Sequence, residues 1–150
     1  MVYYSETGNE SGFDREKVRA ALDAVLSNFR ERKRMLILPP DTTRAHSGAG
    51  MITELLWEQM GERVTDILPA LGTHMPMEPA EISRMFGKTP HSLFREHHWR
   101  TDIEELGRVP GSFVSSVTGG RLSFDYPAQV NRLLSSGGHD LIISVGQVVP

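Results

Sequence analysis

The sequence predicts an α/β fold: a layered α/β/α domain with a mostly parallel sheet and a β-hairpin insertion. Two observations support this prediction. Apolar runs typical of buried strands alternate along the chain with segments of helical periodicity, and two alternating segments flank a Gly-Gly turn. With 150 residues and 39% hydrophobic content, the chain fits one globular domain. We assign residues 1–13 to an N-terminal tail and residues 14–150 to that domain.

The first half of the domain is expected to contain two pairs of a helix followed by a strand. Over residues 14–30 the apolar positions recur at spacings of three and four, which predicts an amphipathic helix. Residues 35–38 form an apolar run that Pro39-Pro40 must end, because proline cannot donate to a strand ladder. The same patterns predict a second helix over 49–60 and a second strand over 64–71.

The second half supplies the hairpin and the last strand. Alternating apolar and polar residues on both sides of Gly119-Gly120 predict the hairpin, and a fully apolar run predicts the last strand. In chain order the expected elements are a helix over 78–86, a strand over 94–99, hairpin strands over 112–117 and 121–126, a helix over 127–134 and a strand over 141–145.

Composition and motifs exclude several classes of protein. A net charge of −3 gives no electrostatic case for binding nucleic acid or an anionic membrane, and the absence of cysteine rules out thiolate chemistry. No apolar run approaches the length of a membrane span, so we expect a cytoplasmic protein. We find no His-Glu-x-x-His motif, phosphate-binding glycine loop or Gly-x-Ser-x-Gly elbow, and we predict no metal site within this chain.

Polar side chains follow two of the predicted strands. Asp41 and Arg44 come after the first strand, and His74 comes after the second. Ligands of open parallel sheets bind outside the carboxyl ends of the strands. Asp41 and Arg44 could hold a hydroxyl-rich and an anionic group, or Asp41 could cap the next helix and pair with Arg44. His74 could exchange a proton near neutral pH, or it could be structural.

Three motifs resemble the lactate racemases that use a nickel-pincer nucleotide. They are Asp41-Thr42-Thr43-Arg44, Ala70-Leu71-Gly72-Thr73-His74 and Asp140-Leu141-Ile142-Ile143-Ser144-Val145-Gly146, and their order and separations are similar across residues 14–150. The resemblance implies the N-terminal α/β domain of a two-domain enzyme. Such enzymes interconvert the stereoisomers of 2-hydroxy acids, so a small-molecule 2-hydroxy acid is the expected partner. Among hydroxy acids and sugar acids the substrate is left open.

The resemblance also implies roles for four residues. His74 corresponds to one of two histidines that exchange the hydroxyl proton while a hydride moves to and from the cofactor. Arg44 corresponds to the arginine that holds the substrate carboxylate. Asp41 corresponds to an acidic residue that lines the cofactor or substrate pocket, and Asp41 and Thr43 are the expected cofactor-binding residues. The second histidine, the phosphate loop, the cofactor-linked lysine and the nickel-binding histidine are all expected after Gly146. We therefore expect these 150 residues to be inactive alone.

Two other interpretations remain open. The chain could be a nucleotide- or anion-binding module without catalysis, in which Asp41 and Arg44 hold ribose and phosphate and His74 is structural. Alternatively, the polar groups at the strand ends could only cap helices. The positions of Asp41, Arg44 and His74 in the structure bear on this choice.

Overall fold

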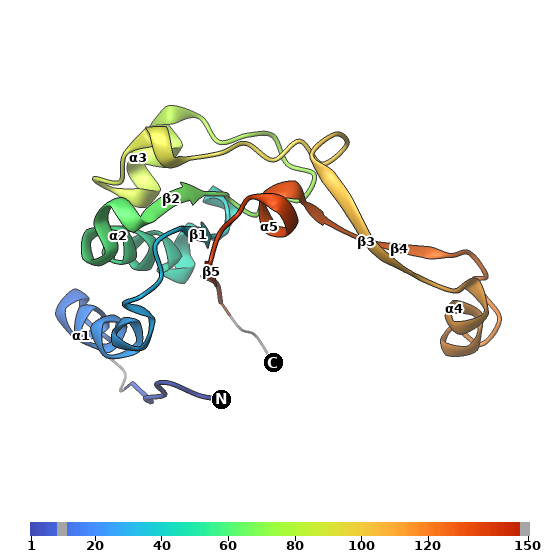
Figure 1. Cartoon of the computed structure of the whole chain (residues 1–150), viewed down its shortest axis with the longest axis horizontal. Coiled ribbons are helices and arrows are strands. Elements are labelled where there is room, and N and C mark those ends of the chain that lie inside the picture. The colour runs from blue at the N-terminus through green and yellow to red at the C-terminus, as the bar shows by residue number, and fades with distance from the viewer. Residues whose placement is uncertain (9–11, 148–150) are drawn as a thin grey trace. The chain divides into compact units, whose positions relative to one another are not determined.

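The computed structural model describes residues 1–8 and 12–147, and the chain forms two compact units (Figure 1). Unit 1 comprises residues 1–97 together with the segment that begins at His139. Unit 2 comprises residues 98–138. Parts of the predicted tail and of the C-terminal end, residues 9–11 and 148–150, lie outside the described residues.

Unit 1 contains a three-stranded parallel sheet. The strands lie in the order β2-β1-β5, so β1 is central and pairs in parallel with both neighbours. The helices and strands are α1 (Arg15–Leu26), β1 (Met35–Leu38), α2 (Ala49–Met60), β2 (Val64–Ile67), α3 (Pro79–Phe86) and β5 (Leu141–Ser144), with short 3-10 segments η1 (Ser27–Phe29), η2 (Thr42–Ser47), η3 (Gly61–Arg63) and η4 (His91–Leu93). This arrangement confirms the predicted mixed α/β fold and its parallel sheet.

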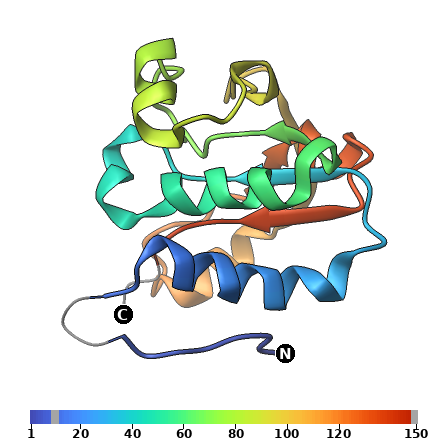
Figure 2. The same ribbon diagram turned by 90° about the vertical axis from the view of Figure 1, so that its left-hand side faces the viewer.

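The core of unit 1 lies between one face of the sheet and its helices. Alternate residues of a strand face the same side, and the odd-numbered residues of β1 and β5 pack in one cluster with residues of α1 and α2. Figure 2 shows these two helices running alongside the strands. The large fully buried side chains of this core are Met35, Ile37, Leu56, Val64 and Ile67.

The predicted helices of unit 1 form: α2 has the predicted bounds, and α1 and α3 are shorter than predicted. Helix α1 begins where the Asp14 carboxylate accepts a hydrogen bond from the backbone N–H of Lys17 at 2.8 Å, and it continues into η1 up to Phe29. Helix α3 begins with a capping box. The side chain of Glu78 accepts from the backbone N–H of Glu81, and the side chain of Glu81 accepts from the backbone N–H of Glu78. The cap residues therefore fix the start of each helix.

Two predicted strands of unit 1 differ from the structure. Strand β2 ends at Ile67 instead of residue 71, although the amides of Leu68 and Ala70 still donate to the chain of β1 and its extension at 2.9 and 2.8 Å. The strand predicted over 94–99 is wrong. Only Phe94 forms a bridge there, to Ile67, because the following residues leave the sheet edge.

Unit 2 contains the predicted hairpin insertion, but the residues assigned to its strands were wrong. Its elements are β3 (Ile103–Val109), α4 (Gly111–Val117), β4 (Tyr126–Asn131) and α5 (Arg132–Ser136), and β3 pairs antiparallel with β4. The segment predicted as the first hairpin strand is α4, where the hydroxyls of Ser116 and Thr118 donate to carbonyls one turn earlier. The helix predicted over 127–134 is also wrong for its first five residues, which belong to β4.

Candidate functional site

Two of the predicted site residues are in direct contact at the carboxyl ends of β1 and β2. Asp41 follows the Pro39-Pro40 pair after β1, and His74 follows β2 in a turn that opens at Gly72, whose φ is +58°. The Nδ1 atom of His74 lies 2.5 Å from Oδ2 of Asp41. Parallel strands end at the same edge of the sheet, which brings together residues 33 positions apart.

Asp41 also caps the segment that follows it. Its Oδ1 atom accepts hydrogen bonds from the backbone N–H of Thr43 at 3.0 Å and from the Thr43 hydroxyl at 2.5 Å. The residue is only 5% exposed. Burial by itself raises the pKa of Asp41, but the hydrogen bonds from Thr43 and His74 outweigh it, so the pKa lies below its usual value of 3.8. Asp41 is therefore a buried, ionised acceptor.

This contact sets the orientation of the His74 ring. An ionised carboxylate can only accept, so Nδ1 of His74 donates to Asp41 and carries the proton. In the neutral ring Nε2 is then the acceptor. The His74 side chain is 57% exposed, while that of Asp41 is 7% exposed. Asp41 thus orients the His74 imidazole through Nδ1, and the basic Nε2 atom is left available to a ligand.

Arg44 lies beside an open cleft of about 460 Å³ at the ends of β1 and β5. The residues that line this cleft are Pro40, Arg44, His46, Gly146 and Gln147. The backbone N–H of Arg44 donates to the carbonyl of Asp41 at 3.0 Å, but its guanidinium bonds no group in the described part of the chain. Asp41 caps a turn, as one interpretation expected, yet it does not pair with the Arg44 side chain.

Replacing Thr43 with valine tests the hydrogen bonds that hold Asp41. The Thr43→Val variant keeps the backbone donor and the side-chain shape but loses the hydroxyl donor, so we expect a loss of about 1 kcal/mol in the free energy of unfolding. Urea denaturation measures this change. Thr42→Val is the matched control, because no hydrogen bond of the Thr42 side chain is found in the part of the chain that the structure describes. Equal losses in both variants would contradict the role of Thr43.

A second polar cluster, which the sequence analysis did not identify, lies inside unit 1. The Asp66 carboxylate is 2.7 Å from Nε2 of His139 and accepts a 2.6 Å hydrogen bond from Nε of Arg95. The His139 side chain is 1% exposed. Within residues 1–8 and 12–147, no group of three His, Cys, Asp or Glu residues could hold a metal ion. The cluster therefore joins the buried Asp66 and His139 side chains to a partly exposed arginine.

Comparisons with known proteins include a solved structure of a similar fold. No protein-family model matches the chain, and no curated protein matches it either. The chain is similar to a protein from Thermotoga maritima whose crystal structure the Northeast Structural Genomics Consortium determined, with 26% identity and a TM-score of 0.77 over 88% of this chain. This likeness supports the α/β fold. The chain spans about a third of that protein, matching 33% of its length, and that protein's name states no activity.

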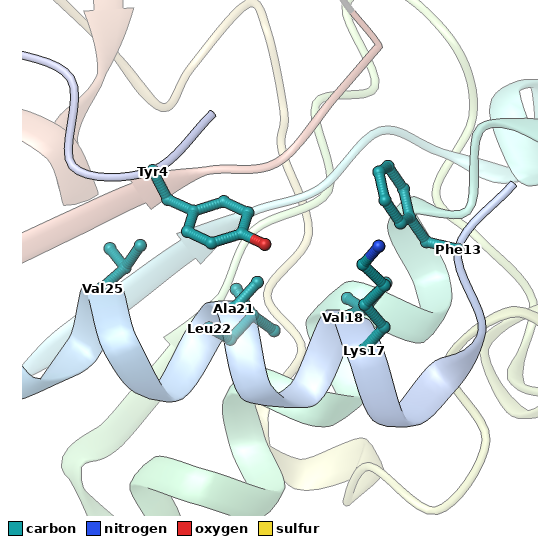
Figure 3. Close-up of a pocket in the computed structure, with 7 residues that line it drawn as sticks. All are labelled: Tyr4, Phe13, Lys17, Val18, Ala21, Leu22 and Val25. Atoms are coloured by element: carbon teal, nitrogen blue, oxygen red, sulfur yellow. The ribbon is translucent and has the colours of Figure 1, made fainter. Parts of the chain in front are cut away.

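A second cavity, of about 250 Å³, lies along α1 and away from these polar groups (Figure 3). Tyr4 and Phe13 of the predicted tail cover it from one side, and Val18 and Leu22 of α1 are among the residues on the other. Its lining is almost entirely apolar apart from the Lys17 amine and the Tyr4 hydroxyl. The described part of the tail therefore packs on α1.

None of the described helices is long and apolar enough to span a membrane.

Proposed function

We propose that the ends of β1, β2 and β5 form part of the active site of a cytoplasmic, nickel-dependent 2-hydroxy acid racemase or epimerase of the lactate racemase type. The observation that carries this proposal is the contact between Asp41 and His74. It presents a basic imidazole nitrogen at the edge of the sheet where Arg44 also follows a strand, although His74 is not among the described residues that line the Arg44 cleft. No partner of the Arg44 guanidinium is found within the described structure. A 2-hydroxy acid offers one group for each: a hydroxyl and a carboxylate.

Each residue has a chemical task in this proposal. The guanidinium of Arg44 presents a planar fork of donors that matches a carboxylate, and it fixes the substrate at the cleft. The Nε2 atom of His74 takes the proton of the 2-hydroxyl group and later returns it. Asp41 stabilises the imidazolium that forms, because its buried carboxylate stays ionised 2.5 Å from Nδ1.

The residues expected to bind the nickel-pincer nucleotide have other partners in this structure. Asp41 uses both carboxylate oxygens, one on Thr43 and one on His74, and neither Asp41 nor Thr43 lines the cleft. The described residues thus do not show a fit for the cofactor, and no step of the chemistry above passes through it. Binding of that nucleotide by the complete protein stays a prediction of the resemblance.

Nuclear magnetic resonance of the His74 ring tests the proposed proton exchange. We expect lactate to shift the Nε2 signal of His74, because the hydroxyl bonds to it, and propionate, which lacks the hydroxyl, to leave it unchanged. Arg44→Ala should weaken lactate binding by about tenfold or more, because a charge-assisted contact is lost. Arg84→Ala, at an exposed arginine of α3, is the matched control. Equal responses to lactate and propionate would contradict the proposal.

The main alternative is a nucleotide- or anion-binding module without catalysis. The observation that favours it is the cleft itself, since Arg44 and His46 line it and no acidic residue is among its described lining residues. Calorimetry with mononucleotides separates the two. Binding that persists in His74→Ala but is lost in Arg44→Ala would support the module, because only the racemase needs the imidazole.

A further inference from the structure

The cleft beside Arg44 contains two further polar side chains. His46 belongs to η2, as Arg44 does, and Gln147 follows β5. Residues two apart in a regular 3-10 helix point to different sides, because three residues make one turn. Arg44 departs from that geometry, with φ −111° and ψ 22°, and both Arg44 and His46 line the same cleft. With this kink in η2, the His46 imidazole and the Arg44 guanidinium both line one cleft.

Among residues 1–8 and 12–147, these side chains have no partners. No hydrogen bond or ion pair of His46, Gln147 or the Arg44 guanidinium is found to any other described residue. Their polar groups come from two segments that are about 100 positions apart in the sequence and meet at the same edge of the sheet. The cleft volume of about 460 Å³ lies within the range of small-molecule sites. The lining thus offers more polar groups than one carboxylate uses.

We propose that the substrate is a 2-hydroxy acid with a second anionic group on its side chain, a hydroxy dicarboxylic acid, and that His46 and Gln147 bind this second group. The inference rests on the function proposed above, which places the first carboxylate on Arg44. A substrate with a methyl side chain, such as lactate, would remove water from His46 and Gln147 without replacing the hydrogen bonds that are lost. A carboxylate restores those bonds, and sites built from polar groups discriminate strongly against ligands that lack the matching group.

Calorimetry of this chain with three acids tests the inference. Lactate and malate share the 2-hydroxy acid group and differ in the second carboxylate, and succinate has two carboxylates without the hydroxyl. We expect malate to bind about tenfold more tightly than lactate, as one charge-assisted hydrogen bond contributes. The His46→Ala variant should reduce this malate-to-lactate ratio to about one. His91→Ala, at an exposed histidine that bonds Ser83, is the control and should keep the ratio.

The outcomes separate this inference from the proposed function. Lactate binding as tightly as malate, or a ratio that His46→Ala leaves unchanged, would overturn the assignment of a second anionic group and leave the proposed function standing. Succinate binding as tightly as malate would show that the hydroxyl is not recognised, which contradicts the proposed function while the second subsite remains. Failure of both hydroxy acids to bind would overturn both.

Discussion

Gly50→Ala is expected to lower the free energy of unfolding by about 2 kcal/mol. Gly50 lies in the first turn of α2, where α3 packs closely against it. A Cβ atom at this position would lie 2.1 Å from the carbonyl oxygen of Met85 and 3.0 Å from its carbonyl carbon. The nearest obstructing atom belongs to the backbone of α3, so rotation of the Met85 side chain cannot relieve the contact and the two helices must separate. This cost exceeds the gain of about 1 kcal/mol in helix propensity from glycine to alanine.

Urea denaturation measures the effect, and Gly107→Ala provides the control. No heavy atom lies within 4 Å of a Cβ built at Gly107, which does not have a positive φ, so little change is expected there. If the urea midpoint of Gly50→Ala equalled that of the unaltered chain, α3 could move away from α2 without a loss in the free energy of unfolding. The close packing of these helices would then not contribute to stability.

The sheet of unit 1 could be predicted because its strands are buried. Residues of β1 are apolar at every position, and such runs bounded by proline or glycine indicate a core strand without any knowledge of tertiary contacts. The helices α1 and α2 could be predicted equally well, since each packs an apolar stripe on that sheet. Burial leaves a pattern in the sequence, and this pattern identified the elements that position the site.

Unit 2 could not be predicted in the same way because its strands are exposed. Strand β3 is exposed at Glu104 through Arg108, so no alternation of apolar residues marks it. The segment 112–117 has apolar residues that suit either a short strand or a helix of fewer than two turns. Its helical form depends on local bonds, such as that from the backbone N–H of Gly111 to the Asp125 carboxylate. Sequence periodicity carries no signal for such contacts.

The residues of the candidate site could be predicted from the sequence, but the contacts between their side chains could not. That Asp41 and His74 lie at one edge follows from parallel strand ends, which the sequence indicates. The bond between them depends on the turn at Gly72, and the kink at Arg44 in η2 is a local departure that no sequence pattern indicates. The Asp66–His139 pair joins residues 73 positions apart. An aspartate within the otherwise apolar end of β2 was the one available signal.

Asp66→Asn is expected to destabilise the chain by about 2 kcal/mol at neutral pH, because it removes the charge that accepts the hydrogen bonds of His139 and Arg95. The substitution keeps the shape of the side chain, so no cavity forms. An amide has a single acceptor oxygen and cannot accept from both partners through two oxygens, as the carboxylate can. Glu105→Gln is the matched control, since Glu105 also pairs with an arginine but at the exposed surface, and little change is expected there.

The effect of Asp66→Asn is also expected to depend on pH. Burial raises the pKa of Asp66, but the hydrogen bonds from His139, Thr65 and Arg95 outweigh it, and the folded-state pKa lies below 3.8. The stability that this shift contributes is complete above the unfolded pKa and is lost as the pH falls through the folded pKa. Urea denaturation should therefore show the gap between Asp66→Asn and the unaltered chain at its largest above about pH 5 and narrowing in acid. A gap of constant size would mean that shape, and not charge, makes Asp66 necessary.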